Sequence, residues 1–167
     1  METFQYLDAI ETKLQNSFDI CRNYKINDLK YDLFAEYHLR SERYIAVKKA
    51  IVYAFENNEY CLIKCYKELN SDICNTFVNS LKDSIESIVN PSNEHMSSAI
   101  TGVMVTEKIH EENLEHIRKK IEQFKYNKGF AFGFKGWADI RLILVSLNEG
   151  LIITNKKGKE VMEVYSF

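Results

Sequence analysis

The chain has 167 residues and a mass of 19.6 kDa, which is enough for one domain with a sizeable hydrophobic core. Hydrophobic residues make up 46% of the chain and charged residues 28%, and these values exclude a disordered protein and a coiled coil. The net charge of −2 disfavours a protein that binds chiefly through phosphate contacts, because such proteins carry a basic surplus.

Cysteine usage and the N-terminal segment predict a cytoplasmic protein. The four cysteines form no CxxC pattern, which is typical of reduced thiols. On one strand, Cys61 and Cys65 would lie about 13 Å apart, too far for a disulfide or a shared metal ion. The first fifteen residues lack the basic start and apolar run of a signal peptide, and no segment has the ~18–20 apolar residues of a membrane span. The richness in Asn, Lys, Ile and Tyr is typical of an AT-rich bacterial genome.

The first half of the chain predicts one helix and three strands. Apolar residues at three- and four-residue spacing predict an amphipathic helix over residues 3–20. From Tyr31 the hydrophobic period changes to two, which favours strands. The predicted strands are 31–39, 43–55 and 59–69, and the predicted turns between them are 40–42 and 56–58.

Two further helices and a buried strand follow. A helix is predicted to begin with Ser71 as its cap and to stop at Asn90-Pro91. Residues 98–106 are nearly all apolar, as expected of a strand covered on both faces. A third helix is predicted from about Glu111, because acids at its start and lysines towards its end suit the helix dipole.

The last third of the chain is predicted to be extended. Predicted strands at 130–134 and 138–147 are followed by turns at 148–150 and 155–158 and by a final strand at 160–167. The resulting order is α-β-β-β-α-β-α-β-β-β. We therefore predict a single α/β domain over residues 1–167, bordering on α+β, with a mixed sheet and about three helices.

Residues 128–132 match the first five positions of an RNA-recognition signature. In that signature, alternate aromatic rings on a strand stack on bases, and the basic residue meets phosphate. The match ends at Gly133, which replaces an aliphatic residue, and at Lys135, which replaces the last aromatic one. The preceding strand also lacks an aromatic partner. The alternative is that the three phenylalanines of residues 130–134 share one strand face and pack beneath the third helix.

A bend is predicted between Gly133 and Gly136, and the residues around it are the best candidates for binding. On a regular strand, Lys135, Asp139 and Arg141 share a face with Trp137, the only tryptophan. A tryptophan beside charged groups is typical of a binding hot spot, and a ring at the edge of the core is the alternative. The predicted binding residues are Lys128, Lys135, Trp137, Asp139 and Arg141.

The order α-β-β-β-α-β over residues 1–107 resembles the restriction-endonuclease-like nuclease fold. The resemblance implies a metal site with an acid on the second strand and Glu-x-Lys on the third. The third strand offers Lys64 and Lys67, but the residues two positions before them are Leu62 and Cys65. No catalytic residue is carried over, so the resemblance implies at most a degenerate nuclease-like fold without an active site.

Common catalytic and ligand-binding motifs are absent from the sequence. It contains no HExxH, P-loop, GxSxG or GxGxxG, and we predict neither a metal nor a cofactor. An enzyme is still conceivable if His95, Glu107 and Asp139, which lie near strand ends, converge in the fold.

The sequence therefore favours a non-catalytic binding or interaction protein with a protein partner or a second copy of itself. Self-association rests on the final strand, an apolar segment without proline that could form an exposed edge. One alternative is a nucleic-acid-associated protein that uses residues 118–128, the basic end of the third helix. The other alternative is the small enzyme just described.

Overall fold

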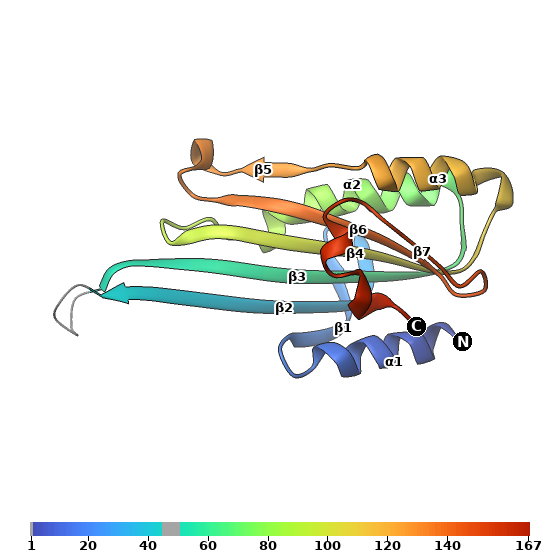
Figure 1. Cartoon of the computed structure of the whole chain (residues 1–167), viewed down its shortest axis with the longest axis horizontal. Helices are drawn as coiled ribbons and strands as arrows, with labels where there is room; N and C mark the ends of the chain where they lie inside the picture. Colours follow the sequence, from blue (N-terminus) through green and yellow to red (C-terminus); the bar gives the residue numbers. More distant parts are fainter. Residues whose placement is uncertain (1, 45–50) are drawn as a thin grey trace.

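The computed structural model describes residues 2–44 and 51–167, and these residues form a seven-stranded mixed β-sheet with helices on both faces (Figure 1). The strands are β1 (Asp19–Ile26), β2 (Leu29–Tyr44), β3 (Ile51–Leu69), β4 (His95–Ile109), β5 (Asn127–Gly129), β6 (Trp137–Ser146) and β7 (Leu151–Thr154). The α-helices are α1 (Thr3–Leu14), α2 (Ser71–Ile88) and α3 (Glu111–Gln123). Short 3-10 turns are η1 (Ala131–Gly133), η2 (Gly158–Glu160) and η3 (Met162–Tyr165). This order confirms the predicted α/β class and mixed sheet.

The sheet combines an antiparallel half with a parallel half. Its strand order is β1-β2-β3-β4-β6-β5. β7 also pairs with β6, at residues 143–146, whereas β5 pairs with β6 at residues 137–139. β1, β2 and β3 pair antiparallel, whereas β3, β4 and β6 pair parallel. Parallel neighbours need a crossover connection. Helices α2 and α3 lie in these connections and pack on the same face of the sheet.

Two hydrophobic cores lie on opposite faces of the sheet. On one face, Phe77 and Leu81 of α2 and Ile117 of α3 are fully buried. On the other face, α1 packs through Tyr6 and Ile10 against the sheet. Because α1 has only 12 residues, it covers one end of the sheet and leaves the other end of that face uncovered (Figure 1). None of the described helices is long and apolar enough to cross a membrane.

The predicted strand at 160–167 is wrong, because η2 and η3 occupy this segment. Tyr165 is buried against α1, where the Tyr6 hydroxyl donates to its carbonyl oxygen at 2.6 Å. The segment therefore packs across the core as turns instead of pairing along the sheet. Self-association stays a prediction, but the edge strand on which it rested does not exist.

Asn155 explains why the chain leaves the sheet after β7. Its side chain is buried and lies at the part of β6 between its pairings with β5 and β7. Oδ1 accepts from the amides of Leu142 at 3.0 Å and Gly158 at 2.7 Å. Nδ2 donates to the carbonyl oxygens of Ile140 at 3.0 Å and Phe124 at 3.2 Å. One side chain thus replaces strand partners for β6 and fixes the following turn.

Several other predicted boundaries are wrong. The first helix ends at Leu14, and the exposed edge strand β1 was missed because few of its residues are buried. The predicted turns at 40–42 and 56–58 lie inside the long strands β2 and β3. The predicted strand at 43–55 includes residues 45–50, which lie outside the described residues. The cap of α2 is Asn70, whose side chain accepts from the amide of Ile73 at 2.9 Å, and not Ser71.

We expect Asn155→Ala to destabilise the protein by about 2–4 kcal/mol, because four backbone groups lose their partner in a buried site. The measurement is the free energy of unfolding in urea. Asn148→Ala, in the exposed turn after β6, is the matched control and should change this energy by less than about 0.5 kcal/mol. Equal costs for the two variants would contradict the assigned role of Asn155.

We expect the free energy of unfolding to fall as the pH rises above about 9. Burial raises the pKa of the Cys61 and Cys65 thiols to about 12 and that of Cys74 to about 11. In the unfolded chain the thiols ionise near pH 8.5, so the unfolded state releases protons that the folded state retains. Each thiol should remove about 1–2 kcal/mol of stability by pH 10. Urea unfolding at stepped pH measures this, and Cys21→Ser should leave the slope unchanged because Cys21 is exposed.

Candidate functional site

The loop between β5 and β6 is not the strand predicted at 130–134. β5 ends at Gly129, and residues 131–133 form η1. Ala131 and Phe132 have φ values of 48° and 55°, and Gly133 and Gly136 have φ values of 89° and 76°. Such left-handed backbone is uncommon for residues other than glycine. The three phenylalanines therefore do not share one strand face, and they form neither a base-stacking row nor a layer beneath α3.

Hydrogen bonds hold this loop in one shape. The amides of Phe130 and Lys135 donate across it to Gly136 O and Phe130 O, at 2.9 and 3.1 Å. His95 Nδ1 donates to the carbonyl oxygen of Lys135 at 2.6 Å. The His95 ring also packs edge-on against Phe130, with ring centroids 5.7 Å apart. The loop is thus fastened to the first residue of β4.

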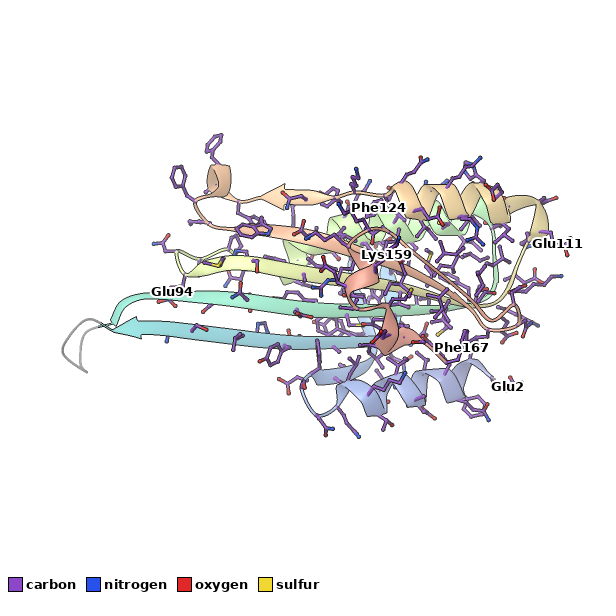
Figure 2. All side chains as sticks on the ribbon, viewed as in Figure 1. Glu2, Glu94, Glu111, Phe124, Lys159 and Phe167 are labelled. Carbon is purple, nitrogen blue, oxygen red and sulfur yellow. The ribbon has the colours of Figure 1, made fainter. Side chains whose placement is uncertain are left out.

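Four apolar side chains protrude around this loop, and we name them the aromatic tip: Met96, Phe132, Phe134 and Trp137. Phe132 is 103% exposed and Phe134 is 88% exposed, while Met96 and Trp137 are each about two-fifths exposed. The loop approaches Met96 closely at Gly136, which has no side chain. A Cβ at this position would lie only 2.3 Å from the Met96 carbonyl oxygen. Figure 2 shows aromatic rings projecting from the end of the molecule where the β5–β6 loop lies. The sequence prediction missed this exposure of Phe132 and Phe134.

His95 is a positioning residue and not a loop residue poised for catalysis. It begins β4 and is 3% exposed. Nδ1 donates to the loop, so Nε2 is the acceptor for the Ser98 hydroxyl at 2.9 Å. A register shift at this point of β4 turns His95 to the face opposite Ser97. The ring therefore packs inward and supports the aromatic tip from below.

Trp137, Asp139 and Arg141 lie on one face of β6, as the alternation of a strand predicts. The register extends this face into two rows across the sheet, and no described helix covers them. One row is Tyr37, Glu59, Ala99, Asp139 and Asn127, and the next is Leu39, Asn57, Ser97, Trp137 and Gly129. We call these two rows, together with Arg141, the open face.

Charged and polar groups on the open face pair with one another. Arg141 is mostly buried and donates to Glu59 at 3.2 Å and Glu160 at 3.4 Å. The Asp139 carboxylate accepts a hydrogen bond from Asn127 Nδ2 at 2.9 Å and lies 3.9 Å from Lys157 Nζ. These contacts pair the charged side chains with one another, and Glu59 and Asp139 stay partly exposed to solvent. The binding role of Trp137, Asp139 and Arg141 stays a prediction.

The two predicted lysines do not join the open face. Lys128 forms an ion pair with Glu86 of α2, on the opposite side of the sheet, and this hydrogen bond raises the pKa of Lys128. Lys135 lies in the loop before β6 and contributes its carbonyl oxygen to His95. The sequence pattern placed Lys135 on the strand face because it assumed an extended chain through Gly136.

The predicted enzyme site is not formed. His95 and Glu107 are twelve residues apart along β4, which corresponds to about 40 Å. Glu107 accepts from the Thr3 hydroxyl of α1 at 3.2 Å, and His95 faces away from Asp139. These three residues cannot act on one substrate atom, so the condition on which the alternative of a small enzyme rested is not met.

The structure also tests the nuclease-like resemblance. Asp32 of β2 lies 3.3 Å from Lys64 of β3, an acid and a lysine on the two strands that the resemblance names. However, Asp32 accepts from the Cys65 amide at 2.7 Å, and Leu62 is fully buried where a second acid is required. Among the described residues, no group of three or more His, Cys, Asp or Glu could hold a metal ion. We therefore assign the Asp32–Lys64 pair as a structural ion pair.

Comparison with known proteins gives a family but no activity. A family model described as a domain of unknown function, DUF8052, matches residues 2–167. The chain belongs to the DUF8052 family. No curated protein and no solved structure significantly matches it.

We expect Gly136→Ala to cost at least about 2 kcal/mol more in unfolding free energy than Gly133→Ala. Both glycines have positive φ, so both substitutions strain the backbone. Only at Gly136 would the new Cβ meet main-chain atoms, 2.3 Å from Met96 O and 2.7 Å from His95 O, whereas Gly133 has open space. Urea unfolding of the two variants measures the difference, and similar costs would show that the loop is not fixed against β4.

Proposed function

We propose that this protein is a non-catalytic binding protein whose aromatic tip inserts into an apolar pocket of a protein partner. The observation that carries the proposal is a pair of fully or nearly fully exposed rings, Phe132 and Phe134, on a loop that is held rigid. A non-catalytic role is supported by the separation of His95, Glu107 and Asp139, the candidate catalytic set, in the fold.

Folding alone does not account for the aromatic tip. Left-handed backbone at Ala131 and Phe132 costs about 1–2 kcal/mol per residue. Each exposed ring also forgoes the stabilisation of about 1.5–3 kcal/mol that burial of a phenylalanine would give. A loop that stores strain in order to expose apolar rings needs another explanation. Binding supplies one, because exposed apolar patches mark interaction sites.

Rigidity strengthens the case for a partner. The hydrogen bonds within residues 130–136 and the bond from His95 fix the loop before any partner arrives. A preorganised loop loses little conformational entropy on binding, so more of the burial energy of its rings appears as affinity. Aromatic anchors that fill pockets on a partner commonly dominate protein interfaces.

The surroundings of the aromatic tip favour a protein partner over a nucleic acid or a lipid surface. The open face beside Trp137 supplies polar groups of both charge signs, the composition expected of an interface rim. Arg40 and Lys128, also near this end of the sheet, pair with Glu94 and Glu86, so the region is not a basic patch. The row of stacked phenylalanines that suggested RNA is not formed.

The partner can be identified by placing a photo-crosslinking phenylalanine analogue at position 134 in cells of the source organism. The same analogue at position 4, an exposed phenylalanine of α1 at another part of the molecule, is the matched control. We expect a discrete protein adduct from position 134 only. The adduct should disappear when Phe132 is changed to Ser in the same chain.

With the purified partner, Phe132→Ser/Phe134→Ser should raise the dissociation constant at least about tenfold, because each buried ring contributes like a hot-spot residue. Phe4→Ser should leave it unchanged, and calorimetry measures both. Undiminished affinity of the double variant would refute the proposal. Tip-dependent flotation with phosphatidylcholine vesicles, without a protein adduct, would instead assign the aromatic tip to a membrane surface.

A further inference from the structure

We propose that the protein has a second binding site, for a small molecule that carries phosphate groups next to an aromatic ring. The site is a depression of about 400 Å³ between the end of α3 and the turn after β7. We name it the lysine pocket, after Lys125, Lys156, Lys157 and Lys159, which surround it and the adjoining hollow. The site shares Asn127 and Asp139 with the open face but contains no residue of the aromatic tip, and it does not depend on the function proposed for the tip.

The lysine pocket is formed by segments that are distant in the sequence. Residues 124–127 form one wall and residues 155–157 form the other, with Asp139 and Ile140 of β6 between them. A second hollow of about 380 Å³ adjoins it, shares Lys156 and is lined by Lys159 and Met162. Figure 2 labels Phe124 and Lys159, which mark the two bordering segments. The volume is in the range of small-molecule sites.

Lysines outnumber acidic residues around the two hollows, because Lys125, Lys156, Lys157 and Lys159 line them together with two acids, Asp139 and Glu122. The ammonium groups of Lys125, Lys156 and Lys159 form no ion pair or hydrogen bond with any residue that the structure describes. Lys157 has only long contacts, 3.9 Å to Asp139 and 3.8 Å to Glu160. The chain as a whole carries a net charge of −2, so a local surplus of unpaired lysines is unexpected. Several ammonium groups around these adjoining hollows suit a multiply charged anion, because hydrogen bonds between charged groups are stronger than those between neutral groups.

The turn that carries two of these lysines is fixed in place. Asn155 is 1% exposed, and its side chain bonds to Leu142, Gly158, Ile140 and Phe124. These bonds join the turn to β6 and to the end of α3 at once. The backbone beneath Lys156 and Lys157 is therefore preorganised opposite Lys125, which lowers the entropic cost of binding.

The remaining lining is aromatic and aliphatic. Phe124 and Tyr126, which are partly exposed, provide apolar surface within the same pocket. The Lys82 ammonium group lies 5.7 Å from the ring centroids of both Phe124 and Tyr126. A planar ring on the ligand can stack on such aromatic surface while its phosphates reach the lysines. Nucleoside phosphates have this combination and are the natural probes.

The test is calorimetric titration of the whole protein with ATP, AMP, adenosine and tripolyphosphate in about 50 mM salt. We expect ATP to bind with a dissociation constant below about 1 mM, AMP and tripolyphosphate to bind more weakly, and adenosine to show no binding. Comparison of ATP with tripolyphosphate separates recognition of the ring from attraction by charge alone. No saturable binding of ATP at about 2 mM would overturn the proposal.

Lys156→Ala/Lys159→Ala should weaken ATP binding at least about tenfold. The matched control is Lys25→Ala/Lys30→Ala, which removes the same charge from exposed positions on β1 and β2 and should leave the affinity unchanged. Equal losses in both double variants would show that ATP responds only to net charge, and would overturn the proposal. Tighter binding of single-stranded DNA than of ATP, with the same lysine dependence, would transfer the site to nucleic acid.

Discussion

The central strands β2, β3 and β4 are much longer than the α1 helix, and most of the exposed chemistry of this protein follows from that mismatch. β3 has 19 residues and extends about 63 Å, whereas the 12 residues of α1 extend about 18 Å. The α1 helix can therefore cover only one end of its face of the sheet. At the other end, strand alternation still points side chains outward, and these positions carry polar and aromatic residues such as Glu59, Asp139 and Trp137. The open face is the direct result.

Two buried polar side chains hold the chain where regular strand pairing stops. His95 bonds to the loop after β5, and Asn155 bonds to the turn after β7. Both are almost completely buried, and all their polar atoms have partners. Fully satisfied buried polar groups of this kind fix one conformation, because any other would leave them unpaired. Each proposed binding surface thus depends on a nearly buried polar residue that fixes the backbone of the neighbouring loop or turn.

Hydrophobic periodicity located the elements that bury a continuous stripe. Nearly continuous apolar runs placed β4 and β6, which are buried on both faces. Periodicity placed α2 and α3 within a few residues, because each helix buries one face along its length. It missed β1, an exposed edge strand, and it misassigned residues 130–134 and 160–167 as strands. In those two segments, apolar residues recur at short spacing, but one segment exposes its rings and the other packs Tyr165 across a core. Periodicity reports which residues are apolar, and it does not report the backbone dihedral angles of a loop.

The sequence by itself determined the α/β class and the mixed sheet, because strand and helix patterns alternate along the chain. It also determined the shared face of Trp137, Asp139 and Arg141, because that face depends on alternation within one strand. Tertiary structure alone decided that Phe132 and Phe134 face water and that Lys125 and Lys156 line one pocket. These features depend on which distant segments are brought together and on the φ values of a few loop residues. Both are set by long-range packing and by hydrogen bonds such as those of Asn155, which no local pattern encodes.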